Sequence, residues 1–82
     1  MQSVDERIEV LGKNIRQYRN IKKLTQEELA NRCYCSRQTI MNAEKCNRIN
    51  GISVLTLLYI AEALEIDIGT LFIANSDCII SR

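Results

Sequence analysis

The 82-residue chain has room for one small domain, so we expect no second, ligand-binding domain. Proline is absent, glycine occurs three times and 46% of the residues are apolar, a composition that suits short helices around an aliphatic core. The net charge is only +1, but residues 13–48 carry nine Lys and Arg against three Glu, an excess of +6. That excess suits contact with a polyanion, although an ordinary solvated surface would also explain it.

No apolar run reaches the roughly 18 residues of a membrane span, and no signal peptide is recognisable. We therefore expect a cytoplasmic protein with no membrane partner.

The first helix is expected over about residues 4–21. Ser3 and Glu6 fit a capping box at its start, and Lys22 and Lys23 at its end complement the helix dipole. Apolar residues recur at intervals of three and four and form its expected buried stripe, namely Ile8, Leu11, Ile15 and Tyr18.

Two short helices with a tight connection are expected next, over about residues 26–33 and 37–45. Thr25 with Glu28 fits a second capping box, and Ser36 repeats the capping signal. The outward face of the second of these helices begins with polar side chains whose donors and acceptors match base edges in a major groove. These side chains are Arg37, Gln38, Thr39 and Asn42.

A fourth helix is expected after Ser53, and a short fifth helix after Asp67, because both residues are good helix caps. The inward stripe of the fourth helix is expected to contain Leu57, Leu58, Ala61 and Leu64, widened by Val54 and Ile60. The fifth carries Ile68, Leu71 and Phe72. The tail, residues 73–82, is too short for a core of its own, so packing back, fraying and pairing with a partner all stay open.

Neither a metal site nor a catalytic site is predicted. The four cysteines lack the Cys-x-x-Cys pairs of structural zinc sites, and the chain has no histidine. Small buried hydrophobes explain Cys33 and Cys35, with zinc binding and thiol-based redox sensing as the alternatives. The usual nucleophile, base and phosphate-loop arrangements are missing, so a non-enzyme without a cofactor is expected.

Several motifs occur in a fixed order: Leu24-Thr-Gln-Glu-Glu-Leu-Ala, Ser36-Arg-Gln-Thr-Ile, Glu44, Leu57-Leu-Tyr-Ile-Ala-Glu-Ala-Leu and Leu71-Phe72. Together, over about residues 10–72, they resemble the Cro/C1-type (XRE) helix-turn-helix family, including small phage-type repressors and restriction-modification controller proteins. The resemblance implies an all-α, compact five-helix bundle of the lambda-repressor-like type, with the helix-turn-helix at helices two and three. It implies a single DNA-binding domain over residues 1–82 with its core over about 4–72.

The resemblance also implies roles for individual residues. Arg37 and Gln38 begin the recognition helix, where arginine suits guanine and glutamine suits adenine, and Asn42 and Thr39 are further base contacts. Sugar-phosphate contacts are expected from polar residues near the start of helix two, both ends of helix three and helix one, namely Gln26, Ser36, Lys45, Asn47, Arg48, Arg16 and Lys13. The alternative for each residue is a solvated polar side chain.

Arg19 and Glu44 are expected to form a structural ion pair, because the family often joins the ends of helices one and three in this way. Two features depart from the family pattern. Tyr34 stands where the turn usually has glycine, which implies a positive φ at a cost of roughly 1–2 kcal/mol. The loop between Glu44 and Ser53 is longer than usual and lacks the common proline.

The expected function is sequence-specific binding of double-stranded DNA by a homodimer on a palindromic operator, as a repressor or an operon controller such as a restriction-modification controller. The alternative is an antitoxin or another protein-interaction module with secondary DNA binding, which makes RNA polymerase and a toxin further candidate partners. The expected dimer interface lies at the apolar C-terminal end, extended by tail 73–82, and comprises Ile66, Ile68, Leu71, Phe72 and Ile79.

Overall fold

The computed structural model describes residues 3–45 and 52–73, and all secondary structure in this part of the chain is helical. Four α-helices are followed by a 3-10 helix: α1 (Val4–Ile21), α2 (Gln26–Arg32), α3 (Arg37–Glu44), α4 (Val54–Leu64) and η1 (Ile68–Phe72). The all-α prediction is confirmed. The five-helix prediction needs a correction, because the fifth element is a 3-10 turn and not an α-helix.

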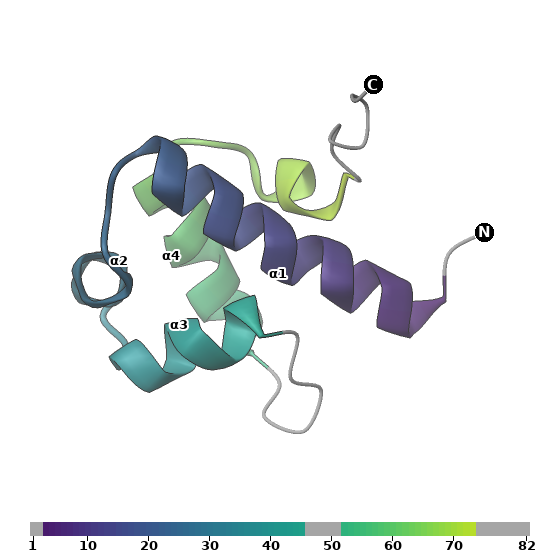
Figure 1. Cartoon of the computed structure of the whole chain (residues 1–82), viewed down its shortest axis with the longest axis horizontal. Coiled ribbons are helices and arrows are strands. Elements are labelled where there is room, and N and C mark those ends of the chain that lie inside the picture. Colours follow the sequence, from purple (N-terminus) through teal and green to yellow (C-terminus); the bar gives the residue numbers. More distant parts are fainter. Residues whose placement is uncertain (1–2, 46–51, 74–82) are drawn as a thin grey trace.

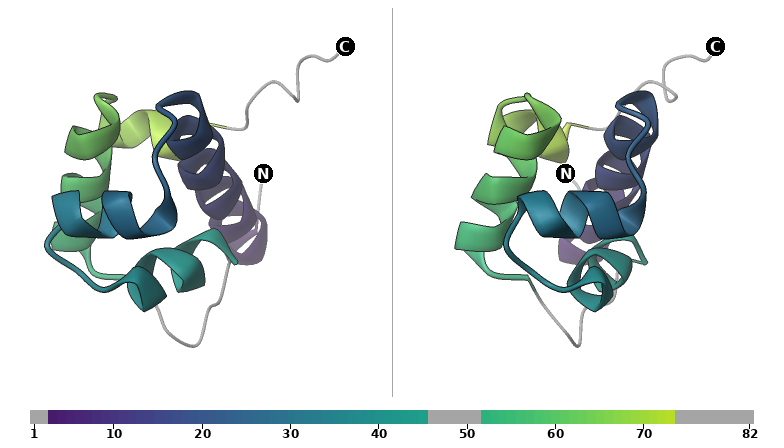
Figure 2. Two further views of the ribbon diagram at one scale, coloured as in Figure 1. Left: turned by 60° about the vertical axis from the view of Figure 1, so that its left-hand side comes forward. Right: turned by 90° about the vertical axis from the view of Figure 1, so that its left-hand side faces the viewer.

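The helices form a closed arrangement around one core. In Figures 1 and 2, α1 and α4 lie on two sides of the molecule, and η1 bridges them at one end. α3 packs against α1, and α2 lies against both α3 and α4. The outer surface of α3 is therefore left uncovered by the other helices.

Side-chain caps explain where the helices begin. Ser3 and Thr25 form complete capping boxes with Glu6 and Glu28, as predicted. Ser53 Oγ likewise accepts from the backbone N–H of Thr56 at 3.1 Å. The predicted cap at Asp67 is wrong, since its side chain makes no capping hydrogen bond. Its carbonyl instead accepts from the N–H of Thr70 at 2.9 Å, which closes the first turn of the 3-10 helix.

Aliphatic side chains from every helix fill the core, and the fully buried ones include Ile15, Leu29, Ile40, Ile60, Leu64 and Leu71. On α4, the buried face consists of Leu57, Ile60, Ala61 and Leu64. The prediction that Leu58 and Val54 are also inward is wrong, because both are exposed. Leu58 lies about 100° around the helix from Leu57, and Val54 lies in the first turn, at the edge of the core.

Asn14 is the one buried polar residue among the described residues, and its role was not predicted from the sequence. Its Nδ2 donates to the carbonyl oxygens of Leu71 at 2.8 Å and Ile73 at 2.9 Å. These two bonds tie η1 and the residue after it to the middle of α1. Each also satisfies a carbonyl that the short 3-10 turn leaves without a helical partner.

Arg19 and Glu44 form an ion pair that joins the ends of α1 and α3. Arg19 Nε lies 2.6 Å from Glu44 Oε2, and Nη2 donates to Oε1 at 3.2 Å, so the contact is bidentate. Both side chains are largely buried, with 12% and 5% of their surface exposed. Arg19 Nη1 also donates to the carbonyl of Leu24 at 2.8 Å, and Gln26 Nε2 donates to Glu44 Oε1 at 3.1 Å. One carboxylate therefore fixes α1, α2 and α3 relative to one another.

Replacing Asn14 with alanine should lower the free energy of unfolding by about 1–3 kcal/mol, because it removes the donor shared by two carbonyls near the core. Urea denaturation measures this loss. Lys13→Ala, an exposed change one residue earlier on α1, is the matched control and should stay within about 0.5 kcal/mol. Equal unfolding midpoints for Asn14→Ala and wild type would contradict the role given to Asn14.

Glu44→Ala should lower the free energy of unfolding by roughly 3–5 kcal/mol, because it leaves the Arg19 guanidinium buried without its counter-ion. Replacing Arg19 and Glu44 together with leucine removes both charges and should recover most of that loss. Thermal and urea unfolding of both proteins measure the change in the free energy of unfolding. Glu27→Ala, on the exposed surface of α2, is the control. A stable Glu44→Ala protein that loses only affinity for DNA would show that Glu44 has a binding role instead.

Candidate functional site

The start of α3 presents polar side chains to solvent. Ser36 caps the helix, since its Oγ accepts from the backbone N–H of Thr39 at 3.2 Å. Ile40 is fully buried and fixes the inward face. Arg37 and Gln38 consequently lie on the exposed face, and Asn42, one turn later, is half-buried.

The predicted base-contacting residues differ in how far they are already bonded within the chain. Arg37 is exposed and forms no ion pair with another described residue. Gln38 Nε2 donates to Asn42 Oδ1 at 3.0 Å, so these two amides form a pair. Thr39 Oγ1 lies 3.0 Å from Ser36 Oγ, and both hydroxyls therefore belong to the helix cap.

The turn between α2 and α3 has the conformation that glycine usually supplies. Tyr34 has φ of 57°, as predicted for this position. The residue is 80% exposed, and its ring makes an edge-to-face contact with Tyr59 of α4, with the ring centroids 5.0 Å apart. A positive φ costs roughly 1–2 kcal/mol and such an aromatic pair is worth roughly 0.5–1.5 kcal/mol. The contact therefore offsets much of the backbone cost, and the helix-turn-helix is retained without glycine.

A depression of about 440 Å³ separates the start of α3 from the start of α2. Its lining includes two cationic side chains and the N-terminal residues of α2: Arg19, Thr25, Gln26, Glu27 and Arg37. Gln26, predicted to contact a phosphate, directs its amide nitrogen to Glu44. Its side chain is thus held in place beside Arg37 by the same carboxylate that binds Arg19.

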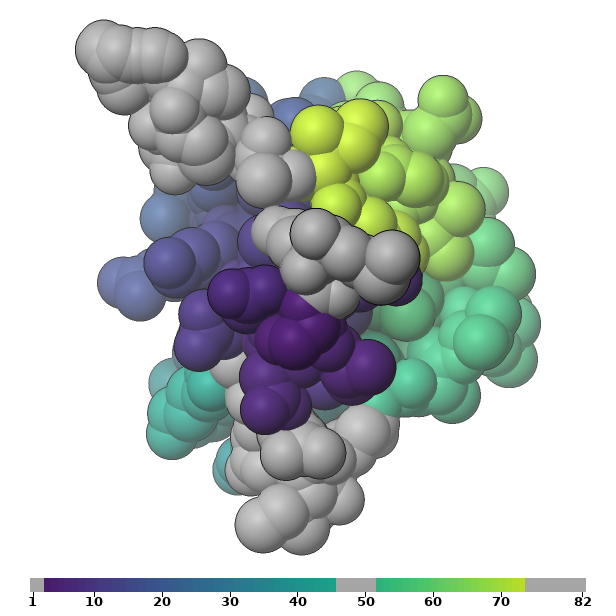
Figure 3. Space-filling model, turned by 90° about the vertical axis from the view of Figure 1, so that its right-hand side faces the viewer, coloured from purple at the N-terminus to yellow at the C-terminus, as the bar shows by residue number. Residues whose placement is uncertain are grey.

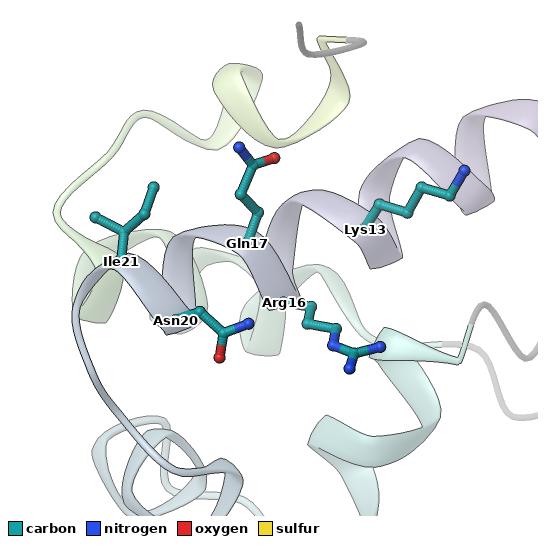
Figure 4. Close-up of a pocket in the computed structure, with 5 residues that line it drawn as sticks. All are labelled: Lys13, Arg16, Gln17, Asn20 and Ile21. Carbon is teal, nitrogen blue, oxygen red and sulfur yellow. The ribbon is translucent and has the colours of Figure 1, made fainter. Parts of the chain in front are cut away.

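The predicted backbone-contacting cations flank α3. Lys45 is exposed at the C-terminal cap of α3. Arg16 and Lys13 are exposed on α1, where they line a shallow hollow of about 470 Å³ with Gln17, Asn20 and Ile21. In Figure 4, Arg16 extends toward α3, whereas Gln17 points toward η1. Asn47 and Arg48 lie outside the described residues.

The predicted dimer residues fall into different environments. Ile66 and Ile68 are half-buried and Phe72 is exposed. Leu71 is fully buried in the core of its own chain, so the expectation that it faces a partner is corrected. Ile79 and the rest of residues 74–82 lie outside the described part of the chain.

Two apolar surfaces were not predicted from the sequence. Val54, Leu55 and Leu58 are exposed together on the first two turns of α4. A groove of about 380 Å³ lies between the start of α1 and η1, which are neighbours on the face shown in Figure 3. It is lined by Val4, Arg7, Ile8, Leu11 and Phe72. The distribution of apolar residues in α4 carried a signal for the first surface, because Val54, Leu55 and Leu58 together with the buried residues cover more than half of the helix circumference and cannot all face one core.

The two described cysteines are unpaired and behave as core side chains. Burial raises the pKa of Cys33 to about 12, with a smaller effect of the neighbouring Cys35. Burial also raises the pKa of Cys35. Both groups are therefore protonated thiols at neutral pH, which is the less reactive form. Within residues 3–45 and 52–73, no three His, Cys, Asp or Glu side chains gather in a way that would hold a metal ion.

None of the helices in the described part of the chain combines the length and the apolar character that crossing a lipid bilayer requires.

Comparisons with known proteins point to one family. The family model of the Cro/C1-type helix-turn-helix DNA-binding domain matches residues 14–77. Control protein C.SmaI from Serratia marcescens is 36% identical over 63 residues, which cover 77% of this chain and 73% of that protein.

Two crystal structures have a similar fold. The restriction-modification controller protein C.AhdI from Aeromonas hydrophila superposes with a TM-score of 0.73 and 31% identity, over 79% of this chain and 96% of that chain. The hypothetical transcription factor NHTF from Neisseria superposes with a TM-score of 0.80 over 96% of this chain and 90% of that chain, and at 24% identity it supports the fold alone. The chain therefore belongs to the Cro/C1-type helix-turn-helix family of DNA-binding domains.

Proposed function

We propose that this protein binds double-stranded DNA in a sequence-specific manner and controls transcription of a small operon. The observation that carries the proposal is the outward face of α3, where Arg37 and Gln38 are exposed while Ile40 holds the opposite face in the core. In a helix-turn-helix protein, the second helix enters the major groove with its N-terminal residues toward the bases. Arginine suits guanine there, and glutamine suits adenine.

The remaining contacts position the protein on the duplex. Lys45, Arg16 and Lys13 are exposed cations on either side of the α3 face and suit phosphate oxygens, which carry no sequence information. Gln26 and Ser36 lie at the starts of α2 and α3, and both are already bonded within the chain. We assign them a supporting role next to the phosphates. Thr39 and Asn42 complete the proposed base-contacting face, and Asn47 and Arg48 remain candidates for the backbone.

We further propose that the protein acts as a homodimer on a palindromic operator, as a repressor or as a controller of a restriction-modification operon. C.SmaI, a control protein, and C.AhdI, a restriction-modification controller protein, are relatives above 30% identity, which favours the controller role. The proposed interface uses Ile66, Ile68 and Phe72 at the η1 end of the molecule, extended by Ile79 in the tail. Recognition helices of such dimers lie roughly 34 Å apart, one turn of DNA.

Arg37→Ala should relax the preference for one base pair by roughly 5- to 150-fold, which is 1–3 kcal/mol of lost discrimination. Lys45→Ala should instead weaken binding to all duplexes alike and lower the slope of log K against log salt by about 1. Fluorescence anisotropy with DNA from upstream of the gene, at several salt concentrations, separates the two effects.

Arg32→Ala is the matched control for these variants, because Arg32 is an exposed arginine at the C-terminal end of α2, outside both the proposed DNA-contacting residues and the proposed interface. It should bind this DNA as wild type does. If Arg37→Ala and Gln38→Ala also bind as wild type does, α3 is not the base-contacting helix.

Phe72→Asp should dissociate the dimer, because it places a charge in the proposed apolar interface. Sedimentation equilibrium at micromolar concentration measures the change in mass. Leu55→Asp on α4 is the matched control, since Leu55 is a similarly exposed apolar residue outside the proposed interface. Dissociation by Leu55→Asp alone would place the interface on α4, and a wild-type monomer would contradict the dimer itself.

A further inference from the structure

The amide side chains of Gln38 and Asn42 are joined on the outward face of α3. Gln38 Nε2 donates to Asn42 Oδ1 at 3.0 Å. The two residues are four apart, so they lie on one helix face, one above the other. Gln38 is exposed and Asn42 is half-buried. The less mobile side chain therefore holds the more mobile one.

This bond divides the hydrogen-bonding capacity of the pair unequally. A carboxamide has two N–H donors and an oxygen with two lone pairs. Gln38 uses one N–H in this bond, so its oxygen and its second N–H stay available. The oxygen can accept from the N6 amino group of adenine, and the N–H can donate to N7. Asn42 uses its oxygen to hold Gln38. A bidentate contact of Asn42 with a second adenine would need that same oxygen to accept a second hydrogen bond through its remaining lone pair.

The bond also couples the orientations of the Gln38 and Asn42 amides. Rotation of the terminal amide by 180° exchanges its oxygen and nitrogen, and an adenine contact requires one of the two orientations. With Oδ1 of Asn42 as the acceptor, the nitrogen of Gln38 is held toward Asn42. Turning the Gln38 amide alone would place two oxygens against each other, so the two amides can turn only together.

We propose that Asn42 is a positioning residue for Gln38, and that the two residues together select one adenine in the major groove. The inference rests on the proposed function, because it requires α3 to lie in that groove. Instead of two independent base contacts, the pair then makes one contact through Gln38, and Asn42 supports that contact. Asn42 then affects base preference without choosing a base of its own.

The test begins with selection of duplexes from a randomised pool by the full-length wild-type protein. Binding of wild type, Gln38→Ala, Asn42→Ala and the double variant to the selected duplex and its single-base changes is then measured. Gln38→Ala should lose its adenine preference at one position by roughly 5- to 150-fold. Asn42→Ala should lose preference at that same position, and the double variant should be no worse than Gln38→Ala.

Two further measurements exclude a simple folding effect. Asn42→Leu keeps roughly the size of the side chain and raises its helix propensity but lacks the acceptor, so it should behave as Asn42→Ala does. Replacing the selected adenine with 7-deazaadenine removes N7, and should weaken wild type while leaving Asn42→Leu nearly unchanged. Lys45→Ala lies one turn beyond Asn42 and should retain the adenine preference at lower overall affinity.

The results distinguish a failure of the positioning role of Asn42 from a failure of the proposed function. If Asn42→Ala and Asn42→Leu alter a different base position from Gln38→Ala, or if the two losses multiply in the double variant, Asn42 contacts its own base and the positioning role is overturned. The same holds if both Asn42 variants keep the wild-type preference. If the wild-type protein enriches no sequence from the pool, the proposed function fails and the pairing inference fails with it.

Discussion

The ion pair between Arg19 and Glu44 is the contact on which the geometry of the DNA-binding unit depends. It crosses from the end of α1 to the end of α3, and Glu44 also accepts from Gln26 at the start of α2. Arg19 reaches in addition to the carbonyl of Leu24 in the turn before α2. A seven-residue and an eight-residue helix have little intrinsic stability, so their relative angle must come from such tertiary contacts. Because the pair is buried, its charges are compensated only while all three helices stay in place.

Because α3 is held against α1 and α2, one of its faces packs in the core while the opposite face is presented to solvent. Ile40 occupies the core, while Arg37 and Gln38 are directed outward from the first turn of α3. The Ser36 and Thr39 hydroxyls are bonded to each other at the cap, and the Gln38 and Asn42 amides are bonded along the face. Such side chains lose less conformational freedom on binding than free ones would. Arg16, Lys13 and Lys45 are exposed cations, as suits contacts that need only a negative charge.

Local signals in the sequence predicted the helix starts well, whereas features that depend on distant contacts were missed. Ser3, Thr25 and Ser36 were correctly identified as caps, because capping involves residues three apart. The Tyr34 turn followed from the family resemblance. The exposure of Leu58 and the burial of Leu71 depend on where α1 and α4 cross, which no local pattern specifies. Asn14 was missed for the same reason, since its partners are 57 and 59 residues away.

The central claim is that the outward face of α3 contacts DNA, and an NMR titration tests it most directly. Isotope-labelled protein would be titrated with a duplex from upstream of its own gene, with amide and side-chain shifts followed residue by residue. The account predicts the largest changes at the start of α3, including the Gln38 and Asn42 side-chain amides, with smaller changes at the start of α2. Large shifts confined to α4 and η1, with the α3 signals unchanged, would contradict it.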